Sequence, residues 1–201
     1  KQGSNNGGYL RKAILPMNPA NRNSLSNVIT SLNINSDKTA GSAAYGYAMF
    51  EAYKYFGGGS DGGAPTESTP NPQSATEYGP EAYLGFGAGD RDVDAFKASP
   101  TNEYESPITD ACAQNFIILI SNGSPPTSSD NGADTLLANV GGDATAISLS
   151  SIRSTANLAD EYARFLYQTD VSTELGQQNI RTYTLAVYNS PATGQDPNNI
   201  L

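Results

Sequence analysis

NFIILIS, residues 115–121, is the stretch that decides the fold class predicted for this chain. Its unbroken apolar run is typical of a strand buried on both faces of a parallel sheet, because a strand with one wet face alternates apolar and polar side chains. A second strand is predicted over IRTYTLAVY, residues 180–188, and apolar residues at helical spacing within residues 151–168 predict a helix between the two. This order favours an α/β domain with a parallel sheet.

Two further helices are predicted upstream. Residues 9–17 read as a strand leading into the first helix. That helix has one apolar face, formed by Leu25, Val28, Ile29 and Leu32. The second helix, over residues 42–56, has apolar stripes on more than one side, so we expect it to be covered on more than one side. Three predicted strands are few for a doubly wound sheet, so we expect this chain to be the central part of a larger domain. The alternative is that it forms a small complete domain.

Residues 57–107 interrupt this order with a segment that begins rich in Gly, Pro and Ser and shows little periodicity. Its length exceeds that of ordinary loops, so we interpret it as an insertion and as a candidate contact surface. The insertion contains Tyr78, Tyr83 and Tyr104, which suit equally an adhesive surface that contacts a partner and packing inside the protein. Four tyrosines at helical positions are expected in the core: Tyr45, Tyr47, Tyr53 and Tyr55.

Composition excludes several classes of function. The chain has 201 residues, 37% of them apolar, which suits one domain. Its net charge of -9 repels phosphate backbones and anionic lipid, so no nucleic-acid partner is expected. The absence of histidine removes Ser-His-Asp and Cys-His nucleophile pairs and His-containing zinc sites. The longest aliphatic run, residues 116–120, is too short to span a membrane.

Two groups of oxygen ligands are candidates for a hard cation, Mg²⁺ or Ca²⁺. Ser121 and Asn122 follow the buried strand at the sheet edge where α/β proteins bind ligands, although a plain Asn-Gly turn is favoured there. Asp90, Asp92 and Asp94 alternate like the first half of a calcium loop. An EF-hand needs glycine and glutamate where this chain has Ala95 and Thr101, so an EF-hand is excluded. The remaining interpretations are an irregular calcium loop and a solvated acidic loop, of which the second is preferred.

Paired carboxylates are the remaining catalytic candidates, and they suggest a secreted hydrolase as an alternative function. The pairs are Asp160 with Glu161 and Glu103 with Glu105. Adjacent residues of a helix do not face one another, so the first pair is expected on a solvated face. The single cysteine, Cys112, is a buried thiol, an exposed thiol, or half of a disulfide whose partner lies outside these residues.

Several segments resemble the PilY-like proteins of type IV pilus tips, specifically their von Willebrand factor A-like domain. They cover about a third of the chain and comprise GGYLRKAI (7–14), AMFEAYKYFGG (48–58), SPITDACAQNFIILISNG (106–123), ADEYARFLYQTDV (159–171) and GQQNIRTYTLAVY (176–188). The resemblance implies a Rossmann-like A-type domain, a parallel sheet flanked by helices with a long irregular insertion. It also implies that the first strand, with its D-x-S-x-S metal motif, lies upstream of residue 1.

The resemblance further implies a degenerate metal-ion-dependent adhesion site. The family's threonine falls near Ala43, where Ser42 and Thr39 are the nearest hydroxyls, and its aspartate falls on Asn122 beside Ser121. An amide in place of a carboxylate removes a full charge from the cation's shell, so tight binding of Mg²⁺ or Ca²⁺ is not expected. For Cys112 the resemblance implies a disulfide with a partner outside the segment.

The function implied by the resemblance is noncovalent and non-enzymatic. It is cell adhesion and pilus assembly at an extracellular pilus tip, with minor pilins, the pilus fibre and a surface or host ligand as partners. The alternatives are the carboxylate-dependent hydrolase and a purely structural domain of an extracellular assembly.

Overall fold

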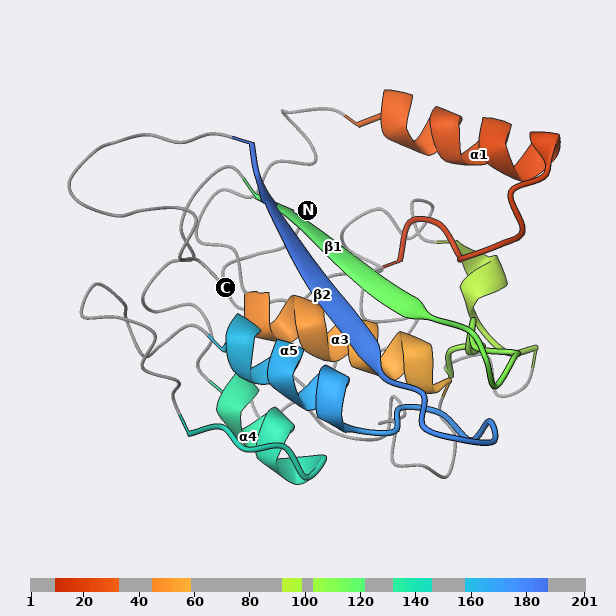
Figure 1. Ribbon diagram of the computed structural model, residues 1–201. Helices are drawn as coiled ribbons and strands as arrows, with labels where there is room; N and C mark the ends of the chain where they lie inside the picture. The colour runs from red at the N-terminus through yellow and green to blue at the C-terminus, as the bar shows by residue number, and fades with distance from the viewer. Residues whose placement is uncertain are drawn as a thin grey trace.

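A computed structural model describes residues 10–32, 45–58, 92–98, 103–121, 132–145 and 158–187. Within these ranges two strands form a small parallel sheet that is flanked by helices (Figure 1). Strand β1, Asn115–Ser121, pairs with β2, Ile180–Ala186, in a register that runs from Asn115 opposite Ile180 to Ser121 opposite Ala186. Both predicted strands and their parallel pairing are confirmed, and the architecture is compatible with the α/β class.

Three of the described helices lie where the sequence predicts helices. They are α1, Pro19–Thr30; α3, Tyr45–Gly57; and α5, Ala159–Gln168. Helix α1 begins where it does because the Asn18 side chain accepts a hydrogen bond from the Asn21 N–H at 2.9 Å, and Pro19 suits the first helical position. A short helix α4, Ala133–Asn139, and a 3₁₀ turn η1, Val93–Ala95, were not predicted. No described helix is both long and apolar enough to cross a membrane.

The core lies between β2 and the helices α3, α4 and α5. Aromatic rings join α3 to α5: Phe50 meets Tyr162 at 6.2 Å between ring centres, and Tyr53 meets Phe165 at 5.2 Å, both edge to face. The Tyr162 hydroxyl donates to the Ala133 carbonyl at 2.8 Å, which fixes the start of α4 against α5. The core role expected for the helical tyrosines is confirmed for Tyr47, Tyr53 and Tyr55, while Tyr45 is half-buried.

In the part of the chain that the structure describes, no helix covers one face of the sheet, and the side chains on it are exposed, so the prediction that β1 is buried on both faces is wrong for this structure. Ile117 and Ile180 point toward the helices, whereas alternate residues point the other way. We call the uncovered side the open face; its apolar residues, 44–65% exposed, are Phe116, Ile118, Ile120, Tyr183, Leu185 and Val187. The physical reason is that α3 and α5 lie on one side of the sheet only (Figure 1).

The strand predicted over residues 9–17 is absent from its described part, residues 10–17. Two of its backbone N–H groups bond to side chains instead of a neighbouring strand. The Ala13 N–H donates to Asp92 Oδ2 and the Ile14 N–H to the Tyr55 hydroxyl, each at 2.8 Å. These bonds hold the segment against α3 and the residues beside η1.

Candidate functional site

The two ends of the insertion, residues 57–107, meet beside the end of α3. The Ser106 hydroxyl donates to the Phe56 carbonyl at 2.7 Å and accepts the Ile108 N–H at 3.1 Å. Gly58 ends the helix with φ +63°, a conformation that favours glycine, and packs directly against Ser106. We call this contact of Phe56, Gly57 and Gly58 with Ser106 the neck of the insertion.

A polar pocket of about 280 Å³ lies at the neck. Its walls are Gly57, Gly58, Lys97, Glu105, Ser106, Ile108, Thr109, Ser172, Thr173 and Glu174. One ammonium and two carboxylates give this neck pocket a formal charge of -1, and four hydroxyls add donors and acceptors. Such a lining suits noncovalent binding of a hydroxylated or cationic group.

Two hydroxyls that line the neck pocket, those of Ser106 and Ser172, also form hydrogen bonds with the backbone. The Ser106 hydroxyl proton points to a backbone carbonyl rather than to a base. Ser172, which is buried, accepts the Glu174 N–H at 3.2 Å. Hydroxyls held in this way can accept further hydrogen bonds from a ligand, which is the chemistry of recognition.

The carboxyl-terminal part of the insertion forms a small antiparallel contact that supports the pocket. Phe96 pairs with Tyr104 and their rings stack 4.6 Å apart. Lys97 lies 2.9 Å from Glu103, whereas Glu105 lines the pocket. Glu103 and Glu105, the pair considered for hydrolysis, therefore lie in different surroundings: Glu103 pairs with Lys97, and Glu105 lines the pocket. Tyr104 is buried, which decides between packing and contact for this residue; Tyr78 and Tyr83 lie outside the described residues.

A buried ion pair anchors this contact to α3. Lys54 Nζ lies 2.7 Å from Glu51 Oε2, and the two side chains are only 2% and 5% exposed. The Tyr104 hydroxyl donates to the other oxygen of Glu51. The Lys54 ammonium also lies 5.8 Å from the ring centres of Phe50 and Tyr104, within range of cation–π attraction. Because burial removes water from both charges, each depends on its partners.

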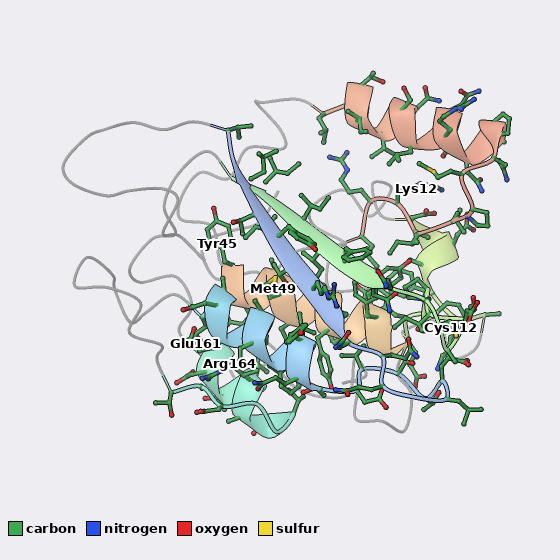
Figure 2. All side chains as sticks on the ribbon, viewed as in Figure 1. Lys12, Tyr45, Met49, Cys112, Glu161 and Arg164 are labelled. Carbon is green, nitrogen blue, oxygen red and sulfur yellow. The ribbon has the colours of Figure 1, made fainter. Side chains whose placement is uncertain are left out.

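Of the predicted calcium loop, the structure describes Asp92 and Asp94. Asp92 Oδ2 lies 2.8 Å from Lys12 Nζ and accepts the Ala13 N–H, while Oδ1 accepts the Asp94 N–H at 3.3 Å. This set of donors balances the Asp92 charge within the protein, and Asp94 is exposed. Asp90 lies outside the described residues, so the three-carboxylate site stays a prediction. Figure 2 shows Lys12 on the segment that leads to α1.

The environment of Asp92 predicts a pH-dependent contribution to stability. Burial alone would raise the pKa of Asp92, but hydrogen bonds from Lys12, Ala13 and Asp94, with the Lys12 charge, outweigh it and lower the pKa below 3.8. A pKa that is lower in the folded state stabilises the protein above the unfolded value, and this stabilisation is lost as pH falls through the folded value.

We therefore expect Asp92→Asn to lower the free energy of unfolding by roughly 1–2 kcal/mol at pH 7. The difference from the native protein should shrink as the pH falls below about 4, because the carboxyl of the unfolded chain then takes up its proton, and it should vanish only below the lower pKa of the folded state, where the native carboxyl is protonated too. Urea unfolding at pH 7 and at steps down to about pH 2.5 measures this. Asp94→Asn is the matched control and should change little; a cost of Asp92→Asn that is independent of pH would refute the ion-pair explanation.

The other predicted ligands are described only in part. Ser121 ends β1 at the carboxyl edge of the sheet, while Ser42 and Asn122 lie outside the described residues, so the adhesion site stays a prediction. Within the described ranges no group of three or more Asp, Glu or Cys side chains is placed to hold a metal ion.

Two further candidates are placed by the structure. Cys112 is exposed, which removes the buried-thiol alternative and leaves the sulfur accessible; it precedes the amino end of β1 (Figure 2). The solvated face expected for Asp160 and Glu161 is wrong for Glu161, which is 1% exposed on α5, while Asp160 is half-buried. The reason is that Glu161 shares a helix face with Leu158 and Phe165, three residues before it and four after it, and both of these are buried.

Sequence spacing gave no sign of the neck pocket, because its walls come from three distant parts of the chain. The one local signal is the run of three glycines, residues 57–59, since glycine after a helical pattern indicates a helix end.

Searches against protein-family models, curated proteins and solved structures found no significant match to this chain. Its function is therefore inferred from its own residues and from the resemblance that they carry.

Proposed function

We propose that this chain is an A-type domain of a pilus-tip protein, an extracellular module that binds a surface or host ligand noncovalently. Minor pilins would join it to the fibre, so that it also serves pilus assembly. The observation that carries the proposal is the packing of segments that bear the resemblance. NFIILIS and IRTYTLA pair in parallel as β1 and β2, and ADEYARFLYQ packs beside them as α5. A Rossmann-like A-type domain requires this strand–helix–strand packing.

We assign ligand contact to the insertion and the neck pocket at its base. The neck closes the insertion onto one point of the fold, where Ser106 bonds to Phe56. A long segment held at both ends on a packed helix presents its residues from a fixed base, as binding loops on rigid scaffolds do. The pocket's hydroxyls and its carboxylates Glu105 and Glu174 favour a hydroxylated or cationic ligand.

The experiment replaces residues 59–89 by a Gly-Ser linker of equal length in the full-length protein of piliated cells. The neck, Asp92 and the contact of Phe96 with Tyr104 are retained, so the described fold keeps its anchors. We expect normal numbers of pili and a loss of adhesion to the level of cells that lack the protein. A paired variant, Glu105→Ala with Glu174→Ala, tests the pocket separately and should reduce adhesion in part.

Two outcomes would contradict this assignment. Unchanged adhesion with normal pili would show that the insertion is not the contact surface. Loss of the pili themselves would favour a structural role in assembly over ligand binding. Pilus number is counted by electron microscopy, and adhesion is counted as bound cells on the same samples.

A further inference from the structure

The lining of the neck pocket contains hydrogen-bond donors and acceptors that the described fold does not use. The carboxylates of Glu105 and Glu174 are exposed and have no hydrogen-bond or ion-pair partner among the described residues. Lys97 donates to Glu103 at 2.9 Å, which leaves the other N–H groups of its ammonium for a ligand. The Ser172 hydroxyl is 93% buried with its residue and accepts the Glu174 N–H, yet no described group accepts its proton. A ligand that matches this lining offers both donors and acceptors.

The walls that carry these groups are held in place by hydrogen bonds of the fold. The Gln178 side chain, which is buried, donates to the Ala111 carbonyl at 2.6 Å and so ties the loop of residues 172–174 to the segment before β1. The antiparallel contact described above holds the wall that carries Lys97 and Glu105. Groups that are fixed before binding lose little conformational entropy when a ligand arrives.

Charge and size select among the ligands that such a lining can bind. The pocket's formal charge of -1 and the chain's net charge of -9 repel anions, including acidic saccharides. A cation would meet the Lys97 ammonium and would leave the donors of Lys97 and Ser172 without an acceptor. An uncharged hydroxyl group both donates and accepts, so it pairs with either kind of group. A volume of about 280 Å³ is at the low end for small-molecule sites and suits a small ligand.

We propose that the neck pocket binds an uncharged saccharide. Neighbouring hydroxyls of the sugar donate to the carboxylates of Glu105 and Glu174 and accept from Lys97 and Ser172. Ile108 adds an apolar part of the wall, which the C–H groups of a sugar ring contact. This inference rests on the proposed function, because it names the ligand class of the same site.

Calorimetric titration of the full-length protein with uncharged saccharides tests this ligand class. The panel comprises hexoses, pentoses, N-acetylhexosamines and their disaccharides, and the cationic probes are spermidine and an arginine-rich peptide. We expect saturable binding of at least one saccharide. Its affinity should change little between about 0.05 and 0.5 M salt, because an uncharged ligand has no charge for salt to screen.

Two charge-matched double variants locate the binding. Glu105→Gln combined with Glu174→Gln should weaken the saccharide's affinity by about tenfold, because hydrogen bonds to charged acceptors are the stronger ones. Asp94→Asn combined with Asp134→Asn removes the same charge from exposed residues outside the pocket and should leave the affinity unchanged.

Three outcomes would overturn the proposal. They are no saturable binding by any saccharide of the panel, binding that the Glu105 and Glu174 double variant retains in full, and preferential binding of spermidine or the arginine-rich peptide. The last would assign the pocket to a cation. The proposed function fails differently: if replacing residues 59–89 leaves adhesion unchanged while the saccharide still binds through the pocket, the ligand class stands and the adhesive role does not. Loss of adhesion in that variant without saccharide binding by the native protein gives the reverse.

Discussion

Replacing Lys54 by methionine should lower the free energy of unfolding by roughly 3–5 kcal/mol, because it leaves Glu51 buried without its cation. Methionine fills a similar volume, so the loss reports charge rather than packing. The Tyr104 hydroxyl still donates to Glu51, but one neutral donor does not replace an ammonium 2.7 Å away. Urea unfolding followed by circular dichroism measures the change.

A matched control and a double variant make this prediction specific. Lys97→Met breaks the partly exposed pair with Glu103 and should cost less than about 1 kcal/mol. Glu51→Leu combined with Lys54→Met removes both charges and should recover most of the loss, because an apolar pair of similar size tolerates burial. The explanation fails if Lys54→Met costs no more than Lys97→Met, or if the double variant is as unstable as the single one.

Gly58→Ala is expected to lower the free energy of unfolding by roughly 2–4 kcal/mol. The backbone at φ +63° disfavours an L side chain, and the new Cβ would lie 2.6 Å from the Ser106 Cβ and 2.8 Å from its backbone nitrogen. Ser106 cannot retreat without stretching its bond to the Phe56 carbonyl. The substitution therefore opens the neck, and adhesion should fall together with stability.

Gly176→Ala separates the two causes of this effect. Gly176 also has positive φ, at +90°, but no atom lies within 4 Å of an added Cβ. Its substitution should cost only about 1 kcal/mol, the backbone part alone. Equal costs at Gly58 and Gly176, measured by the same unfolding experiment, would show that the close approach of Ser106 contributes nothing.

Periodicity in the sequence predicted the elements that are long and regular. The apolar run of β1 and the helical spacing in α3 and α5 give the strands and the main helices. Helix α4 was not predicted because it has only seven residues and lies in a polar segment. Its only sign in the sequence was the apolar pair Leu136 and Leu137. Residues 10–17 look like a strand but bond to the side chains of Asp92 and Tyr55, a choice that depends on tertiary contacts.

The candidate site was less predictable because it depends on contacts between distant segments. Ser106 and Phe56 are fifty residues apart, and no spacing rule pairs them. Glu51 and Lys54 resemble a solvated pair on a helix, and their burial was not predicted, although apolar stripes on more than one side of α3 predicted a covered helix. The adhesion-site residues follow from the family resemblance alone.

The pilus-tip role is the central claim, and immunogold electron microscopy of the cells that make this protein tests it most directly. Antibodies raised against the chain are applied to native cells and to cells from which the gene is deleted. An adhesion module at the tip predicts gold at the free ends of pili on native cells and none on the deletion strain. Gold confined to the cell interior, with pili left unlabelled, would contradict the claim.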